Sequence, residues 1–263
     1  MSVIEQSAPA KYPDVRNYIG GSFVDSDGHD HLDVTNPANG SVISRVPLSG
    51  MNEVERAVDA AKNAQPAWAA TPIKERVQVF YRYKALLEKH IDELATLVTE
   101  ENGKIRNEAE AEVLKSAELC EFACSLPQII PGEVLEVSRG VECRVERYPV
   151  GIVASITPFN FPNMVPNWTI PNAIALGNAM ILKPSEQVPI SSGRIADCSP
   201  RPDCRTASST SCTADSRASR RFAIIRRSNR SASSDRRTSR RSSIAAAPRI
   251  SSASSPSAVR RIT

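Results

Sequence analysis

The amide side chain of Asn160 stands in a short run that restricts the backbone, Pro158-Phe-Asn-Phe-Pro162. We expect these neighbours to hold the amide in place and to shield it from water. A fixed amide donor in a dry site can stabilise an oxyanion in acyl or aldehyde chemistry, where losing one such donor costs about a hundredfold or more in rate. Spacing alone favours the alternative, in which Asn160 simply turns a loop between two prolines.

Lys183 and Glu186 form a second polar pair, three residues apart and directly after an apolar run. Their ammonium and carboxylate groups could hold the ribose hydroxyls of a nucleotide. An exposed ion pair on the first turn of a helix explains the same spacing, and the residues alone leave both interpretations open.

Both polar clusters follow short apolar runs that are rich in β-branched residues, at 151–156 and 179–182. Such runs, ended abruptly by Pro and polar residues, are typical of strands that are buried on both faces of a parallel sheet. The segment between them is long enough for a crossover helix, which predicts a βαβ unit. Because open α/β sheets bind ligands at the carboxyl ends of their strands, we expect the residues from Thr157 to Pro162 and from Lys183 to Glu186 to share one site.

The residues before this unit predict the elements that support it. Gly20-Gly21 predicts a hairpin over residues 17–24, and alternation over 133–148 predicts a half-exposed hairpin that turns at Arg139-Gly140. Further strands are expected at 32–35 and 41–46. Amphipathic patterns predict four helices: one from a capping box of Asn52 and Glu55 to Pro66, one over 73–87 with Arg76 outside, one over 91–98, and one through Cys124 whose acids, including Glu112, form a solvated face.

Charge is distributed unevenly along the chain. Residues 1–193 carry 17 Lys+Arg against 25 Asp+Glu, a net charge of −8, whereas residues 194–263 carry 16 Arg against 4 Asp, a net charge of +12. The basic segment contains one aromatic residue, Phe222, and few large apolar side chains. Such a segment cannot bury enough surface to offset the entropy of ordering its backbone, so we expect residues 193–263 to be a disordered Arg/Ser-rich tail. Residues 1–14 lack a periodic pattern and are expected to be a loose arm.

Composition also bears on the cellular compartment and on metals. No apolar run is long enough to span a bilayer, and none follows a basic N-terminal segment, so we expect a cytoplasmic protein that does not contact membranes. Cys120 and Cys124 are four residues apart on a predicted helix, but no histidine lies near them. We therefore expect buried apolar cysteines and no metal site.

Three motifs carry a family resemblance. Asn36-Pro37, Ile156-Thr-Pro-Phe-Asn-Phe-Pro162 and Leu182-Lys-Pro-Ser-Glu186 resemble the aldehyde dehydrogenase superfamily in order and spacing. The similarity covers residues 15–192. It implies an α/β fold, here an incomplete Rossmann-type NAD-binding domain with N-terminal helices and a β-hairpin near 133–148 of the kind that joins subunits in a homo-oligomer.

Within that superfamily, the chain is most similar to the CoA-acylating methylmalonate-semialdehyde dehydrogenases. Ser138-Arg-Gly-Val141, Phe159 and Met164-Val-Pro166 carry this finer resemblance. It implies the NAD-dependent oxidation of methylmalonate or malonate semialdehyde. In the family a cysteine attacks the aldehyde, hydride passes to NAD, and the thioester is transferred to coenzyme A, with loss of carbon dioxide in the methylmalonate case.

The resemblance also implies roles for single residues. Asn160 matches the asparagine of the oxyanion hole. The positions that match cofactor contacts in the family are Thr157, Phe159, Lys183, Glu186 and Gln187, the last standing where Arg is expected in closer relatives.

The resemblance stops near residue 192, and no nucleophilic cysteine can be carried over. Cys198, Cys204 and Cys212 lie too close to the lysine motif, in Ser/Arg-rich sequence without apolar neighbours. We therefore expect a truncated and inactive form, which a shift of reading frame near codon 193 would explain. Two alternatives stay open: a noncatalytic NAD-binding fragment, and nonspecific nucleic-acid binding through the arginine pairs of the tail.

Overall fold

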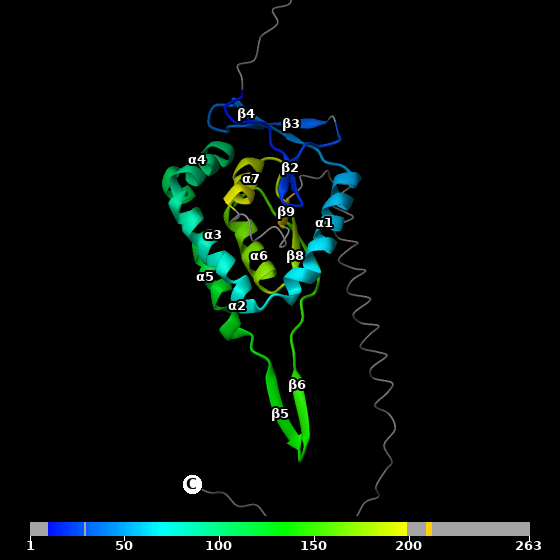
Figure 1. The fold of residues 1–263 in the computed structure, drawn as a ribbon. Coiled ribbons are helices and arrows are strands. Elements are labelled where there is room, and N and C mark those ends of the chain that lie inside the picture. The colour runs from blue at the N-terminus through cyan, green and yellow to red at the C-terminus, as the bar shows by residue number, and fades with distance from the viewer. Residues whose placement is uncertain (1–9, 29, 199–208, 212–263) are drawn as a thin grey trace, which may run out of the picture. The chain divides into compact units, whose positions relative to one another are not determined.

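The computed structural model describes residues 10–28, 30–198 and 209–211, all within one compact unit (Figure 1). The elements follow in the order β1 (Asn17–Ile19), β2 (Ser22–Val24), β3 (His31–Thr35), β4 (Val42–Pro47), α1 (Met51–Ala70), α2 (Ile73–Arg76), α3 (Gln78–Lys89), α4 (Ile91–Asn102), α5 (Arg106–Ile129), β5 (Glu133–Ser138), β6 (Val141–Val145), β7 (Ile152–Ile156), α6 (Met164–Ala175), β8 (Ala179–Lys183), α7 (Pro189–Cys198) and β9 (Ser209–Ser211).

One mixed sheet positions the candidate site. Its strand order is β2-β1-β9-β8-β7, with β7, β8 and β9 parallel and β1 antiparallel to both β2 and β9. The helix α6 connects β7 to the parallel β8, which confirms the predicted βαβ unit. The predicted N-terminal hairpin is also confirmed, because β1 and β2 pair across Gly20 and Gly21, which both have positive φ angles.

Helices cover both faces of β8, and all five of its residues are buried. Ala179 and Ile181 pack in a cluster with residues of α1, whereas Met180 and Leu182 belong to the larger cluster formed with α3, α5 and α6. The sheet therefore lies between two helical layers. This alternation explains why β8 reads as a continuous apolar run in the sequence.

Strand β7 differs from the expectation of burial on both faces. It lies at one end of the strand order, and Ala154 and Ile156 are exposed. The apolar runs in the sequence therefore did not distinguish the inner strand β8 from the edge strand β7, because both runs contain the same residue types.

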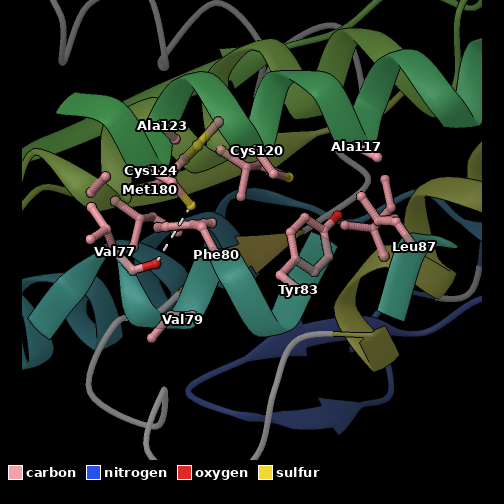
Figure 2. Packing of buried hydrophobic residues seen from close by; sticks show 14 of the residues in the cluster. Val77, Val79, Phe80, Tyr83, Leu87, Ala117, Cys120, Ala123, Cys124 and Met180 are labelled. Atoms are coloured by element: carbon pink, nitrogen blue, oxygen red, sulfur yellow. Dashed lines mark hydrogen bonds between the residues drawn. The ribbon is translucent and has the colours of Figure 1, made fainter. Parts of the chain in front are cut away.

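The main core lies between α3 and α5, as Figure 2 shows. Phe80, Tyr83 and Leu87 of α3 face Ala117 and Cys120 of α5. The thiol of Cys124 donates to the backbone carbonyl of Val77, with Sγ and O 3.8 Å apart. Burial raises the pKa of Cys120 to about 12 and that of Cys124 to about 11, which confirms that both behave as buried apolar residues.

Helix α1 differs from its prediction at both ends. Gly50 is the N-cap residue, and its N–H donates to Glu53 Oε2 at 2.9 Å, so the expected capping box of Asn52 and Glu55 is wrong. The helix also continues through Pro66 to Ala70. Trp68, in this last turn, is buried and donates its indole N–H to Ile174 O at 2.8 Å, so tertiary packing overrides the proline.

Arg76 is buried, although its helical phase placed it outside. Its Nε donates to Ala175 O at 2.9 Å, and its Nη1 donates to Ala69 O at 3.2 Å and to Thr71 O at 2.6 Å. Burial lowers the pKa of this guanidinium. Arg76 thus joins the carboxyl ends of α1 and α6, where helix carbonyls lack partners of their own.

The ends of the described region also differ from expectation. Tyr12, within the expected loose arm, donates its N–H to Ile43 O at 2.9 Å and its hydroxyl to Glu100 Oε2 at 2.8 Å. Helix α7 continues to Cys198, and Ser209–Ser211 forms β9, although we expected disorder from residue 193. The rest of the expected tail, residues 199–208 and 212–263, lies outside the described residues, as do residues 1–9.

Candidate functional site

The carboxyl ends of β7 and β8 bring the two predicted polar clusters to one edge of the sheet. Ile156 and Lys183 are the last register partners of these strands. One residue further on, the N–H of Thr157 donates to Lys183 O at 3.0 Å. The loops that carry Asn160 and Glu186 therefore leave the sheet side by side, as expected from the βαβ unit.

Lys183 is nearly buried and forms an ion pair with Glu186. Its Nζ lies 2.7 Å from Glu186 Oε2, and the exposed fractions of the two side chains are 9% and 42%. Partial burial is the largest single influence and acts to raise the pKa of Glu186, but the hydrogen bond from Lys183, a backbone hydrogen bond and the charge of Lys183 together hold that pKa below its ordinary value. The carboxylate is therefore charged at neutral pH and faces solvent more than its partner does.

The other predicted site residues differ in exposure. Thr157 is buried, whereas Phe159, Asn160 and Gln187 are exposed. The neighbours of Asn160 thus do not shield it from water as we expected. The carbonyl of Phe159 accepts a hydrogen bond of 2.9 Å from Asn102 Nδ2. These positions place Asn160 on an accessible loop at the strand ends, where its role in an oxyanion hole stays a prediction.

Two buried acids at this site were missed by the sequence analysis. Glu112 is 4% exposed and accepts from the N–H groups of Asn163 and Met164, which corrects its assignment to a solvated face. Glu101 is 3% exposed and accepts from the N–H groups at the start of α7.

Helical periodicity held the signal for both acids. Glu101 follows Leu94 and Val98 on one face of α4, and Glu112 follows Ala109 on the buried face of α5. An acid in the apolar phase of a helix is a candidate for burial with specific partners.

A cavity of about 690 Å³ lies elsewhere in the described residues. Its lining comes from residues 12–16, Phe23, α4 and α7, and it includes Arg16, Asp92 and Arg194. None of the predicted site residues lines it. It is therefore distinct from the strand ends.

Among the described residues, no group of three or more His, Cys, Asp or Glu side chains could hold a metal ion. None of the helices at 10–198 is both long and apolar enough to cross a bilayer.

Comparison with known proteins places the chain in a family. The model of the aldehyde dehydrogenase family matches residues 23–201. Malonate-semialdehyde dehydrogenase from Bacillus pumilus is 46% identical over 184 residues, which is 70% of this chain and 38% of that protein. Malonate-semialdehyde dehydrogenase 2 from Geobacillus kaustophilus shows the same identity and coverage. The chain therefore spans about 38% of the length of the curated relatives that it matches.

Solved structures give the same result. Methylmalonate-semialdehyde dehydrogenase from Oceanimonas doudoroffii has a TM-score of 0.74 and 37% identity, and the match covers 79% of this chain and 42% of that one. A protein from Sinorhizobium meliloti, described as a methylmalonate-semialdehyde dehydrogenase complexed with NAD, has a TM-score of 0.73 and 35% identity, with 79% and 42% covered. An NADP-dependent enzyme from E. coli has a TM-score of 0.74 and 33% identity, with 78% and 43% covered.

Proposed function

Because the chain belongs to the aldehyde dehydrogenase family, we propose that residues 15–192 form the dinucleotide-binding part of an NAD-dependent, CoA-acylating dehydrogenase of malonate or methylmalonate semialdehyde. The matched relatives include malonate- and methylmalonate-semialdehyde dehydrogenases, which supports this substrate class. Coenzyme A as the acyl acceptor follows from the subgroup that the motifs resemble.

The pair of Lys183 and Glu186 at the strand ends is the observation that carries this proposal. An ammonium group has three N–H donors, and Glu186 accepts the one hydrogen bond that the Lys183 ammonium donates within the described residues. Donors and a half-exposed carboxylate next to each other match a ribose, whose hydroxyls both accept and donate. The chemistry of these side chains therefore fits the adenosine ribose of a dinucleotide.

Glu186 favours NAD over NADP in this proposal. A carboxylate can accept hydrogen bonds from an unmodified ribose, whereas it repels the 2′-phosphate of NADP. The low pKa of Glu186 keeps this charge across the physiological range. The solved relatives include one complexed with NAD and one that is NADP-dependent, so family membership alone leaves both cofactors open. The charge of Glu186 is what favours NAD.

The reaction needs groups beyond the pair. Bound NAD supplies a hydride acceptor. Asn160 would donate its amide N–H to the oxygen of the substrate, where negative charge develops. Thr157 and Phe159 belong to the loop that leaves β7 next to Lys183, and Gln187 belongs to the loop after β8. We assign these three residues to the walls of the cofactor crevice.

The three cysteines whose side chains the structure describes do not suit the nucleophile. Cys120 and Cys124 are buried in the helical core with raised pKa values, so their reactive thiolate forms are strongly disfavoured. Cys143 lies on β6, in the exposed hairpin. We therefore propose that the 263-residue chain binds NAD without oxidising an aldehyde.

Two measurements on the full chain test this proposal. Titration with NAD, followed by calorimetry, should show saturable binding that weakens with Lys183→Met. Incubation with NAD, coenzyme A and either semialdehyde should give no NADH, followed by its absorbance. No binding at millimolar NAD would contradict cofactor binding, and aldehyde-dependent NADH formation would contradict the inactive state.

Assembly is the second part of the proposal. The β5–β6 hairpin exposes Val134, Leu135 and Val141, and all eleven of its strand residues are exposed. Unburied apolar side chains on a two-stranded ribbon need a partner surface, and we propose a second copy of this chain. Sedimentation equilibrium with Leu135→Ser should show a shift toward monomer, and an unchanged mass would contradict the proposal.

Residues 212–263 lie outside the described residues, so the two predictions for the tail, a shifted reading frame and nucleic-acid binding, are tested without the structure. If the reading frame shifted near codon 193, translation of the DNA in another frame should restore a further helix, a strand and a cysteine. Nonspecific nucleic-acid binding would show as RNA affinity that falls steeply with salt.

A further inference from the structure

The turn between α4 and α5 contacts the loop after β7 and the first turn of α7, which directly follows the loop after β8. We call residues 101–104 together with Glu112 the α4–α5 corner. Residues 157–163 connect β7 to α6, and residues 184–188 connect β8 to α7. Gly103 makes the turn possible, because its φ is +84° and an added Cβ would lie 2.8 Å from Pro37 Cγ.

Glu101 holds the start of α7. Its Oε2 accepts from the N–H of Ile190 at 2.7 Å, and its Oε1 accepts from the N–H of Ser191 at 2.9 Å. These amides belong to the first turn of α7 and have no acceptor within the helix. The carboxylate of another helix thus fixes the residues that follow the Lys183–Glu186 loop.

Glu112 holds the start of α6 in the same way. Its Oε1 accepts from the N–H groups of Asn163 at 2.8 Å and Met164 at 3.0 Å. Its Oε2 accepts from Lys104 Nζ at 2.5 Å, and Ser116 Oγ donates to Asn163 Oδ1 at 2.7 Å. The loop that carries Asn160 is therefore fixed at its junction with α6.

Further contacts tie the loop after β7 to the corner and to α7. Asn102 Nδ2 donates to Phe159 O at 2.9 Å, and Lys104 Nζ lies 3.7 Å from the centre of the Phe161 ring. Ser192 of α7 donates its hydroxyl to Pro162 O at 2.8 Å. Both residues adjacent to Asn160 are thus held by the corner.

Stability alone does not account for two buried carboxylates here. A neutral cap satisfies helix amides without the cost of burying a charge, which is high unless the charge is paired. Glu112 has Lys104 as its partner ion. Burial raises the pKa of Glu101 to about 7 against the hydrogen bonds from Ser191 and Ile190, and the charge of Glu112 raises it further.

We propose that Glu101 and Glu112 are positioning residues for the dinucleotide site: they hold the loops of Asn160 and Lys183 at fixed places relative to each other. Dinucleotide affinity then depends on two carboxylates buried behind the loops. The proposal rests on the proposed function, because it concerns the same site. A purely structural role predicts instead that their loss lowers stability and leaves affinity unchanged in the folded fraction.

Amide hydrogen exchange on the full chain tests the loop contacts without any cofactor. Glu101→Gln should speed exchange at Ile190 and Ser191 by about fivefold, the effect of a lost helix cap, and Glu112→Gln should do so at Asn163 and Met164. Glu108→Gln, an exposed acid on α5, is the matched control and should change neither pair. Unchanged exchange at both pairs would overturn the proposal.

NAD titration of the same variants tests the consequence. At pH 8 each Gln variant should bind NAD about fivefold more weakly, with Glu108→Gln unchanged. For the unchanged chain, affinity should rise between pH 6 and 8 as Glu101 loses its proton, and Glu101→Gln should abolish this rise. The charged group that acts on Glu101 from the corner is Glu112, which is paired with Lys104.

A milder variant tests the proposal if the Gln variants do not fold. If either Gln variant unfolds, Asn102→Ala removes only the hydrogen bond to Phe159 O, and it should still weaken NAD binding about threefold. Equal NAD affinity in the unchanged chain and in all folded variants would overturn the positioning role. If the unchanged chain itself binds no NAD, the proposed function fails, while hydrogen exchange still decides whether the carboxylates hold the loops.

Discussion

Lys183 and Glu186 share one hydrogen bond of 2.7 Å but differ sharply in exposure, with 9% and 42% of their side chains accessible. The ammonium is fixed beneath the loop, whereas the carboxylate reaches the surface. This asymmetry separates their expected roles: Lys183 supplies affinity, and Glu186 supplies selection between cofactors.

Replacement of Lys183 by methionine should weaken NAD binding by about 10- to 100-fold, because a charged hydrogen-bond donor contributes about 1.5–3 kcal/mol. Methionine keeps most of the apolar contact of the lysine stem. Calorimetric titration measures the change. Lys115→Met, an exposed lysine on α5, is the control and should have no effect; equal affinity in the two variants would contradict a role for Lys183.

Replacement of Glu186 by glutamine should change the ratio of NADP to NAD affinity rather than the affinity for NAD alone. Removing the negative charge relieves the repulsion of a 2′-phosphate, so we expect NADP to gain about tenfold relative to NAD. Competition between the cofactors in one titration measures this ratio. A ratio that stays constant would show that Glu186 lies away from the ribose.

Replacement of Arg76 by methionine should destabilise the fold by about 2–4 kcal/mol, because one buried and two partly buried carbonyls lose their donor. Lysine should not rescue it, since one ammonium cannot reproduce the geometry of the guanidinium fork. Urea unfolding monitored by circular dichroism measures the loss. Arg82→Met on the exposed face of α3 should stay within about 0.5 kcal/mol of the unchanged chain, and a similar loss in both variants would contradict the assignment.

Local pattern predicted the elements that build the site. The apolar run of β8, the crossover α6 and the turn at Gly20 and Gly21 depend on neighbouring residues, and all are confirmed. Gly103 ends α4 in the left-handed conformation that glycine adopts readily. These features follow from backbone preference and periodicity alone.

Features that depend on tertiary partners could not be predicted in this way. The helical phase of Arg76 suited a solvent-facing charge, and only the packing of α6 against it provides its buried acceptor, Ala175 O. Glu112 lies on the buried face of α5, but its donors at the start of α6 come from a distant part of the chain. Pro66 would end an isolated helix, but the buried Trp68 keeps α1 in place. A polar residue in a helix has two explanations in sequence, and long-range contacts decide between them.

Glu101 should make stability and cofactor affinity depend on pH in opposite directions. Its pKa is raised from 4.5 to about 7 in the fold, chiefly by burial, so the folded chain keeps a proton that the unfolded chain has released between these values. Stability therefore falls as pH rises through this window, by about 3 kcal/mol in total. The paired acids Glu93 and Glu186 have lowered pKa values, so the stability that they contribute is lost only as pH falls below their ordinary value of 4.5, outside this window. The difference from Glu101→Gln isolates the contribution of Glu101. Urea unfolding at pH 5, 6, 7 and 8 should show that the free energy of unfolding of the unchanged chain falls with pH relative to that of the variant. If the two free energies change with pH in parallel, Glu101 is charged throughout, and it cannot cause the expected fall of NAD affinity below pH 7.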